Sequence, residues 1–285
     1  MERRGADSPA AAALALFGRR VSEHYRDQGR DLPWRRTNDP YAVLVSEVML
    51  QQTQVSRVVP KYAEFLETFP TVEALATAPL DELLRVWRGL GYNRRALNLK
   101  RAAEVILAEN GGRVPDTLDG LTALPGIGHA TAAQVLAFAF DVGVPFIETN
   151  IRSVFLHEFF GDAEDVPDAA ILPLVEATLP AEGAREWFWA LMDYGTHLKA
   201  TLPNPSRRSR HHVQQGRFEG SNRQLRGRLL VALAEDAGSA AGSHGLAADV
   251  LAGIVRFDPE RVSAALAALQ SEGFVVSEDG RWRIG

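Results

Sequence analysis

Apolar residues recur every three or four positions through most of residues 1–200, which is the period of an amphipathic helix. Short runs rich in glycine, proline and aspartate separate these stretches. The helices predicted in this way are 42–58, 83–87, 99–107, 131–140, 151–160 and 184–194. Strand-like alternation is absent before the last dozen residues, so the pattern predicts an all-α first domain.

The composition changes at Thr201–Gly220, which is rich in arginine, histidine and proline and poor in apolar residues. We expect a basic linker or an ordered loop here. Its charge favours a contact with DNA, and a solvated linker without a partner is the alternative. This change predicts a first domain over residues 1–200, a linker or loop over 201–220 and a second domain over 221–285.

The second domain shows three helical stretches, at 222–235, 246–255 and 258–270, followed by a hairpin pattern. Asp258 is a good N-cap for the third helix, and Pro259 suits its first turn. The Asp279-Gly280 dipeptide lies between two apolar runs, which predicts a tight β-hairpin turn. Three helices and a hairpin resemble a winged helix-turn-helix, which either reads DNA or packs against a partner.

The composition narrows the class of protein. The 285 residues are 46% hydrophobic, which is enough for a packed core, and the net charge of −5 argues against a chain that coats DNA over its whole surface. The absence of cysteine excludes disulfides, Cys-ligated zinc and Cys-ligated iron–sulfur clusters. We expect no export signal and no transmembrane segment, and the lack of cysteine fits a reducing cytoplasm.

A glycine-rich turn, Leu124-Pro-Gly-Ile-Gly-His129, joins two helical stretches. Gly126 and Gly128 are able to take backbone angles closed to other residues, and the helix that begins near His129 presents free N–H groups and a positive dipole end. The Lys-Ser/Thr pair of a nucleotide-binding P-loop is missing. The turn is therefore either a binding site for a DNA phosphate or an ordinary turn between helices.

Two carboxylic acids stand out. Glu47 lies in an otherwise apolar helix, with Gln51 one turn further on. Partial desolvation would keep a proton on Glu47 near neutral pH and make it a general acid, unless it simply lies on the exposed face of the helix. Glu148 ends an apolar run just before a helix that Thr149 or Asn150 would cap. Its negative charge suits a sugar cation, unless the segment is only a helix cap.

The order of five motifs resembles that of the MutY-type adenine glycosylases in the helix-hairpin-helix, or endonuclease III, superfamily. The motifs are Leu32-Pro-Trp34, Ser46–Gln54, Gly89-Leu-Gly-Tyr92, the turn after Leu124 and the segment around Asn150. The similarity covers about Leu16 to Gly195. It implies a two-lobed helix-hairpin-helix glycosylase domain, followed here by a small winged-helix-like domain.

The resemblance also implies site residues. Glu47 matches the acid that protonates the extruded purine and helps to activate water, and Glu148 falls where the family has its catalytic Asp. Trp34 and Asn150 would line the base pocket. Gln51 and Tyr92 match residues that enter the base stack where the nucleotide leaves. The expected DNA contacts are Gln51, Gln52, Tyr92, Gly126, Gly128, His129, Ala130, Arg207, Arg208 and Arg210. Backbone carbonyls of Leu124 and Gly126 would hold a structural Na⁺ or K⁺, and no other cofactor is expected.

Several positions depart from the family pattern. Glu148 is one methylene longer than Asp. Ala130 stands where bifunctional relatives carry a Schiff-base lysine, so strand cleavage through that position is not expected. Asn93 stands where a second tyrosine is common. The four cysteines that usually follow Gly195 are absent, as is the usual Nudix-like C-terminal domain.

We therefore expect a monofunctional, monomeric DNA glycosylase that acts on double-stranded DNA with a mismatch or lesion. Adenine opposite 8-oxoguanine or guanine is the favoured target. A glycosylase for uracil or thymine opposite guanine is the main alternative, and a rarer modified base is a further one. Two other hypotheses are that the protein is a catalytically inactive DNA-binding regulator or that it is a bifunctional lyase.

Overall fold

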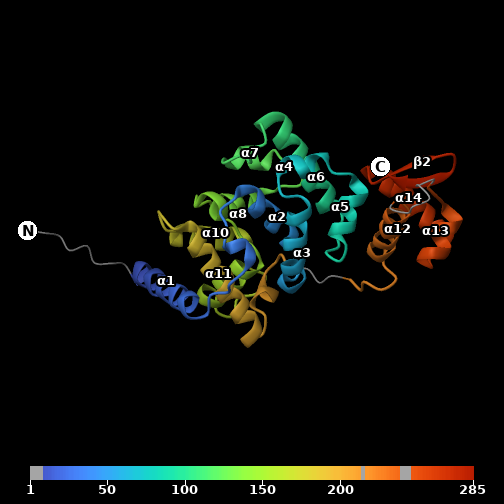
Figure 1. Ribbon diagram of the computed structural model, residues 1–285. Helices are drawn as coiled ribbons and strands as arrows, with labels where there is room; N and C mark the ends of the chain where they lie inside the picture. Colours follow the sequence, from blue (N-terminus) through green and yellow to red (C-terminus); the bar gives the residue numbers. More distant parts are fainter. Residues whose placement is uncertain (1–8, 213–215, 238–244) are drawn as a thin grey trace, which may run out of the picture. The chain divides into compact units, whose positions relative to one another are not determined.

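The computed structural model describes residues 9–212, 216–237 and 245–285 and is largely helical (Figure 1). Its α-helices are α1 (Pro9–Gln28), α2 (Pro40–Leu50), α3 (Val55–Thr68), α4 (Val72–Thr77), α5 (Leu80–Trp87), α6 (Arg94–Asn110), α7 (Leu118–Thr122), α8 (His129–Phe140), α9 (Thr149–Phe159), α10 (Asp168–Thr178), α11 (Ala184–Thr201), α12 (Asn222–Ala237), α13 (Ala248–Val255) and α14 (Pro259–Glu272). Two 3₁₀ turns, η1 (Pro33–Arg35) and η2 (Pro205–Arg208), and three strands, β1 (Leu246–Ala247), β2 (Val275–Glu278) and β3 (Arg281–Ile284), complete it. The prediction of an all-α first domain is confirmed.

The fold divides into two compact units, each assembled from segments that are distant in sequence. The first takes its described residues from Met1–Val43, Asp116–Thr122 and Ile127–Gln214. The second takes them from Leu44–Pro115, Ala123–Gly126 and Gln215–Gly285. The division into 1–200, 201–220 and 221–285 stays a prediction, since it was drawn along the sequence and the units follow contacts in space.

The core of the first unit forms where α1 and α9 pack against α11. Phe17 of α1 lies 5.3 Å from Phe155 of α9 and 6.0 Å from Trp187 of α11, measured between ring centres. These rings are buried because each helix turns one apolar face inward. Aromatic contacts therefore join the start of the chain to helices about 140 and 170 residues further on.

In the second unit, α3 shows a clear helical periodicity. The buried positions of α3 are Val58, Tyr62 and Phe65, spaced by four and three residues. Phe65 meets Trp87 of α5 at 6.0 Å between ring centres, and α4 packs along α6. This apolar core supports the N-terminal end of α6, where candidate site residues lie.

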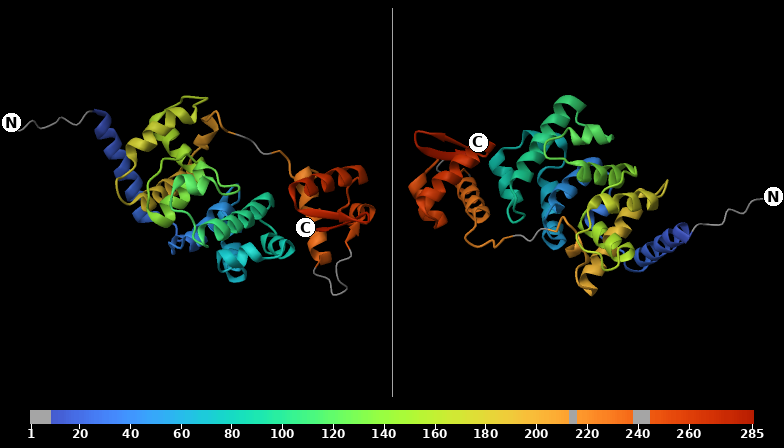
Figure 2. Two further views of the ribbon diagram at one scale, coloured as in Figure 1. Left: turned by 90° about the horizontal axis from the view of Figure 1, so that it is seen from above. Right: turned by 180° about the vertical axis from the view of Figure 1, so that it is seen from behind.

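The C-terminal part of the second unit contains α12–α14 and an antiparallel sheet of strand order β1-β3-β2. Figure 2 shows the hairpin beside the helices of residues 222–272. The predicted turn is confirmed, since Asp279 and Gly280 take positive φ values of 48° and 72°. The predicted cap is confirmed too, since the Asp258 carboxylate accepts the N–H groups of Glu260 and Arg261. The winged-helix interpretation itself stays a prediction.

One predicted helix is wrong. The apolar pattern of 42–58 runs through two helices, because α2 ends at Leu50 and α3 begins at Val55. Gln52 has a φ of 53°, and the Thr53 N–H closes a turn on the Leu50 carbonyl. Gln51 therefore lies beyond the helix of Glu47 and not on its face. Strand β1 was also missed, because two residues are too few to show an alternating pattern.

The described part of the predicted linker is an ordered loop. Helix α11 extends to Thr201, and η2 packs against α9. Arg208 donates to the Leu156 carbonyl at 2.9 Å, and Ser209 forms a bridge with Val166. Residues 213–215 of the predicted linker lie outside the described residues. The loop is ordered because its backbone and one of its arginines bind the first unit.

A buried carboxylate ties the first unit together. Asp193 of α11 is only 3% exposed and receives hydrogen bonds from the side chains of Arg30 and Arg35 at 2.7–2.8 Å, and from the Arg30 backbone N–H at 2.8 Å. Burial on its own raises the pKa of this carboxyl, but the bonds from Arg35 and Arg30 outweigh burial, and the net pKa is lowered. The segment from Arg30 to Arg35, which contains Trp34, is thereby fixed to α11.

Asp193→Asn is expected to lower the free energy of unfolding by about 3 kcal/mol at neutral pH, since two arginines would lose their charged partner in the interior. Guanidinium unfolding monitored by circular dichroism measures this. Because the folded pKa lies below the unfolded one, the stabilisation is full above the unfolded pKa and is lost as the pH falls through the folded one. The difference between wild type and variant should therefore shrink in acid.

Asp31→Asn is the matched control, because Asp31 pairs with Arg36 where both side chains are mostly exposed. An exposed ion pair contributes little, so this variant should unfold like the wild type. An Asp193→Asn protein as stable as the control at neutral pH would contradict the organising role of Asp193.

Candidate active site

Glu47 lies in the interior. It is 5% exposed in α2, beside the buried Val43, Leu44 and Val48, and the Ser46 hydroxyl donates to its carboxylate at 3.4 Å. The alternative of a carboxylate on an exposed helix face is therefore wrong. A carboxyl group in such surroundings is a candidate acid, because an apolar setting favours its protonated form.

The guanidinium of Arg95, at the start of α6, organises the surroundings of Glu47 in the second unit. It donates to the Val48 and Met49 carbonyls, both at 2.8 Å, and so takes up carbonyls at the C-terminal end of α2. Those bonds come from Nη1, and Nη2 donates to the Thr53 hydroxyl and to the carbonyls of Leu90 and Gly91. Burial lowers the pKa of Arg95 to about 10, which leaves it charged at neutral pH. One cation thus fixes both the end of the Glu47 helix and the loop before α6.

That loop presents Tyr92. Gly89 and Gly91 have φ values of 96° and 71°, and Tyr92 itself has a φ of 48°, which is rare for a bulky residue. The Trp87 indole of α5 donates to the Gly91 carbonyl at 3.1 Å, which fixes the loop to α5. Tyr92 is 37% exposed despite its size. The backbone is held in a strained form that turns an aromatic ring toward solvent, as a residue that enters a base stack requires.

In the first unit, Glu148 is the N-cap of α9. Its backbone is extended, and its carboxylate accepts the N–H groups of Asn150 at 2.7 Å and Ile151 at 2.8 Å. The Asn150 side chain donates to the other oxygen at 3.0 Å. The prediction that Thr149 or Asn150 caps this helix is therefore wrong, because the longer Glu148 side chain folds back onto its own helix. Three donors and the helix dipole stabilise one negative charge here.

Helix α11 packs against the first turn of α9, which Glu148 caps. A Cβ at Gly195 would collide with the backbone carbonyl of Asn150, so only glycine permits the two helices to come this close. Next to it, the Thr196 hydroxyl lies 3.4 Å from the Asn150 side-chain oxygen. Burial lowers the pKa of Lys199, one turn further on, and attraction to Glu148 partly opposes this. The position of Glu148 thus depends on close packing between α9 and α11.

Trp34 lies in η1 of the same unit and is buried. Pro33 opens this short turn, and Arg35 closes it with a guanidinium held by Asp193. The same carboxylate therefore places the Trp34 segment against α11. Trp34, Glu148 and Asn150 all belong to the first unit, whereas Glu47 and Tyr92 belong to the second.

The glycine turn has the geometry expected of an anion site. Gly126 has a φ of 76°, and a Cβ there would come within 2.5 Å of the Asn98 amide. Gly128 is the N-cap of α8 and has no side chain to occupy the first N–H groups of the helix. His129 is exposed and Ala130 is half-buried. A helix N-terminus that opens on bare glycine is suited to a phosphate oxygen.

The remaining predicted contacts differ in their surroundings. Gln51 is half-buried and Gln52 is exposed in the turn after α2. Arg207 is exposed, whereas Arg208 is half-buried and bonds to the Leu156 carbonyl. Arg210 is exposed and pairs with Asp165 at 2.7 Å. Of the three predicted arginine contacts, Arg208 therefore has a clear structural role.

The part of the chain that the structure describes holds no group of three or more histidine, aspartate or glutamate side chains arranged to bind a metal ion. No helix within it is long and apolar enough to cross a membrane.

Sequence reasoning missed two residues that position the site. Arg95 is one of two arginines at the start of a helix, and nothing in its neighbours indicates that it binds carbonyls more than 40 residues away. Gly195 did carry a signal, because a glycine inside an otherwise regular helix often marks a close approach of another backbone. Only the fold identifies Asn150 as what approaches it.

The chain is similar to proteins that remove bases from DNA. Residues 45–239 match the HhH-GPD superfamily base excision DNA repair protein family. The chain is 36% identical over 280 residues to an adenine DNA glycosylase of Mycolicibacterium smegmatis, which covers 91% of this chain and 93% of the relative.

Two solved structures share the fold of about two thirds of this chain. A thermostable thymine-DNA glycosylase is 27% identical, with a TM-score of 0.59 over 65% of this chain and 87% of its own. Endonuclease III, trapped as a covalent intermediate with DNA, is 21% identical, with a TM-score of 0.53 over 66% and 84%. The chain therefore belongs to the HhH-GPD superfamily of base excision DNA repair proteins. The predicted superfamily, fold and class of enzyme are confirmed.

Gly195→Ala is expected to lower the free energy of unfolding by about 2 kcal/mol through overpacking against α9. Because Asn150 and Glu148 must shift, single-turnover base excision should slow by about tenfold or more. Thermal unfolding and single-turnover kinetics check both effects.

Gly18→Ala is the control, since Gly18 lies inside α1 of the same unit and a Cβ there meets nothing within 4 Å. This change should stabilise the protein by about 0.5–1 kcal/mol through helix propensity and leave excision unchanged. If both alanine variants behaved alike, the close approach of α9 and α11 would not position the site.

Proposed function

We propose that this protein is a monofunctional adenine DNA glycosylase that hydrolyses the N-glycosidic bond of an adenine mispaired with 8-oxoguanine or guanine. The observation that carries the proposal is the pair of carboxyl groups in opposite settings. Glu47 lies among apolar side chains, and Glu148 accepts three hydrogen bonds at a helix N-terminus. Such a pair suits one group that gives a proton and one that stays negative. The adenine glycosylase name of the M. smegmatis relative supports the choice of base.

The two groups divide the reaction between them. Glu47 donates its proton to a ring nitrogen of the extruded adenine, and the bond between C1′ and the base breaks with both electrons leaving on the purine. Glu148 stabilises the oxocarbenium ion that remains on the sugar. Water then adds to C1′ and gives a proton to Glu47, which regenerates the acid. The products are free adenine and an abasic site.

The extra methylene of Glu148, relative to an Asp, is compatible with this role. The carboxylate folds back and accepts the Asn150 and Ile151 N–H groups, as an Asp at an N-cap does, so its charge stays at the N-terminus of α9. Its distance from the sugar is set by α9 itself, which Gly195 allows to pack closely on α11.

The remaining predicted residues fit a role in holding double-stranded DNA that carries a mismatch. N–H groups at the start of α8 would bind a phosphate, and carbonyls of Leu124 and Gly126 would hold Na⁺ or K⁺ beside it. Tyr92 and Gln51 would enter the base stack beside the extruded nucleotide. We further propose that the protein works as a monomer and is located in the cytoplasm with the nucleoid.

A second candidate is a glycosylase for thymine or uracil opposite guanine. The specific observation that favours it is the likeness to the thermostable thymine-DNA glycosylase, at 27% identity and a TM-score of 0.59. The same fold and the same acid would serve both reactions, so a substrate panel is needed to decide between them. A DNA-binding regulator fits less well, because it has no use for a carboxyl group buried at the position of Glu47.

Glu47→Gln is expected to slow adenine release by about 10³-fold, because the amide has no proton of suitable acidity to give. Binding to lesion DNA should remain within about threefold of wild type, because the change keeps the size of the side chain. Single-turnover excision from a duplex with adenine opposite 8-oxoguanine, and gel shift on the same duplex, measure the two effects.

Glu64→Gln serves as the control, because Glu64 is an exposed helical residue whose ion pair with Lys61 faces solvent. It should excise at the wild-type rate. Thymine or uracil release by the wild type, with adenine untouched, would favour the second candidate. A wild-type rate in Glu47→Gln would show that another group supplies the proton.

The wild type is also expected to leave the DNA strand intact, because Ala130 offers no amine to the sugar. When the product is separated on a denaturing gel with and without alkali treatment, strand breaks should appear only in the alkali-treated sample. Borohydride should trap no covalent complex between protein and DNA. Efficient trapping would mean that another lysine or the terminal amine attacks C1′.

A further inference from the structure

Helices α12 and α14 make polar contacts with both ends of the segment that presents Tyr92. We call Arg88–Arg94 the Tyr92 loop. Arg88, at its start, pairs with Glu235 of α12 at 2.8 Å. Arg94, at its end, pairs with Glu272 of α14 at 2.9 Å. Two helices of the C-terminal part therefore bind the loop on either side of its aromatic residue.

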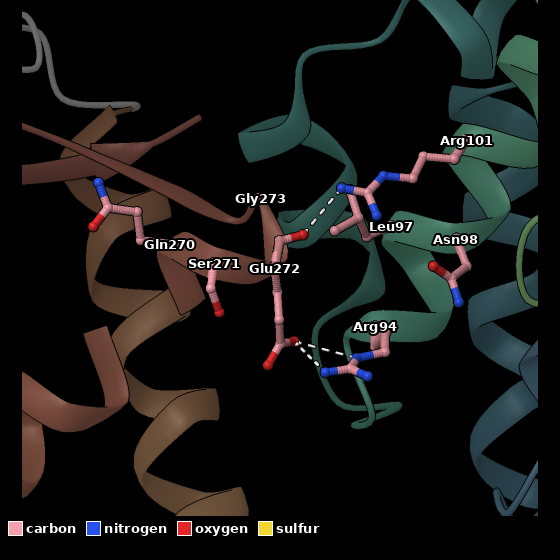
Figure 3. A pocket seen from close by; sticks show the side chains of 8 residues that line it. All are labelled: Arg94, Leu97, Asn98, Arg101, Gln270, Ser271, Glu272 and Gly273. Atoms are coloured by element: carbon pink, nitrogen blue, oxygen red, sulfur yellow. Dashed lines mark hydrogen bonds and ion pairs between the residues drawn. The ribbon is translucent and has the colours of Figure 1, made fainter. Parts of the chain in front are cut away.

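Glu272 is the centre of the second contact (Figure 3). Its carboxylate binds Arg94 and also Arg226 of α12 at 2.8 Å, while its backbone carbonyl accepts from Arg101 at 3.0 Å. Burial raises the pKa of Glu272, but the hydrogen bonds from Arg226 and Arg94 outweigh burial and lower it overall. A charged Glu272 thus joins α14, α12 and α6. Because these pairs are partly exposed, each contributes little alone, and their value lies in fixing geometry.

The most specific contact is made with Tyr92 itself. Arg223, in the first turn of α12, donates to the Tyr92 hydroxyl at 2.9 Å, and its guanidinium carbon lies 5.9 Å from the ring centre. Its second nitrogen donates to the Gly216 carbonyl at 2.7 Å, which fixes the guanidinium in place. Arg95 lies 5.6 Å from the same ring centre. The tyrosine is therefore held at its hydroxyl by the C-terminal part and approached by a second cation from α6.

We infer that Arg223 is a positioning residue for Tyr92, and that the C-terminal part of this chain serves base extrusion by holding that ring ready to enter the DNA. The inference rests on the proposed function, which gives Tyr92 its role as a wedge. A half-exposed ring on a strained loop has other conformations available, and each would cost ordering energy when DNA binds. A hydrogen bond at the ring tip removes that freedom in advance. The C-terminal part therefore acts on the reaction through a side chain and not by reading bases.

The test uses the full-length protein and two readouts. The first is single-turnover adenine release from a duplex with adenine opposite guanine. The second is the fluorescence of 2-aminopurine placed next to a 2′-fluoroadenosine that resists cleavage, which reports unstacking without chemistry. Arg223→Ala should slow release by about tenfold, as expected for one charge-assisted hydrogen bond, and should reduce the fluorescence rise by a similar factor. Thermal unfolding confirms that each variant is folded.

A double-mutant cycle tests whether the effect of Arg223 on adenine release acts through the Tyr92 hydroxyl. Tyr92→Phe removes only the hydroxyl that Arg223 binds, so it should reproduce the Arg223→Ala defect, and the double variant should be no worse than either single one. Arg223→Lys should rescue only partly, because an ammonium lacks the second donor that reaches Gly216. The control is Arg283→Ala, which removes an exposed arginine of the same part, 3.6 Å from the Glu278 carboxylate, and should match wild type.

The outcomes separate the inference from the proposed function. Additive defects in the double variant, or an Arg223→Ala protein that loses affinity but unstacks 2-aminopurine normally, would make Arg223 a DNA contact and overturn the inference. A wild type that unstacks the probe without releasing adenine would contradict the proposed chemistry and leave the positioning test intact. A wild type that leaves the probe stacked would remove the wedge role and with it the inference.

Discussion

The buried bond network of Asp193 is the interaction on which the first unit depends. A carboxylate in an apolar interior is tolerated only when donors surround it, and here Arg30 and Arg35 supply them. The same turn of α11 carries Gly195, which lets the Asn150 backbone approach. Two positions in one turn of α11 thus contribute to two placements, that of the Trp34 segment through Asp193 and that of the Glu148 cap through Gly195. The Trp34 segment therefore depends on a distant carboxylate, whereas Glu148 combines local bonds to Asn150 and Ile151 with the close packing of α9 on α11.

In the second unit, a buried cation fixes segments that are distant in sequence. Arg95 takes the carbonyls of Val48 and Met49, so α2 ends one turn after Glu47 and the chain turns away. The same guanidinium holds Leu90 and Gly91, which fixes the strained backbone of the Tyr92 loop. Glu47 and Tyr92, which are 45 residues apart in sequence, therefore lie in segments that one guanidinium holds. This coupling explains why the loop is able to keep a bulky residue at a positive φ.

The sequence predicted what local rules control. Apolar periodicity predicted helices, Asp258 was predicted as the N-cap of α14, and Asp279-Gly280 predicted the hairpin turn. Each of these features depends on a few neighbouring residues. It failed where a distant group decides. The break after Leu50 is stabilised by Arg95, and the apolar period alone runs through it. The cap of α9 was missed for a local reason, because the Glu148 carboxylate accepts the N–H groups of the first turn and is itself the N-cap.

The site was predictable to a different degree from the fold. Motif order identified Glu47, Glu148 and Tyr92, but it gave no account of what holds their segments, since Asp193, Arg95 and Arg223 act through contacts with residues 42 to 163 positions away. Asp193 holds the segment that contains Trp34, Arg95 holds the end of the Glu47 helix and the loop before Tyr92, and Arg223 binds the Tyr92 hydroxyl. A site built in this way is sensitive to changes outside it. The residues that the motifs mark are the more recognisable part of this site, and the charges that hold their segments are the part that the fold must supply.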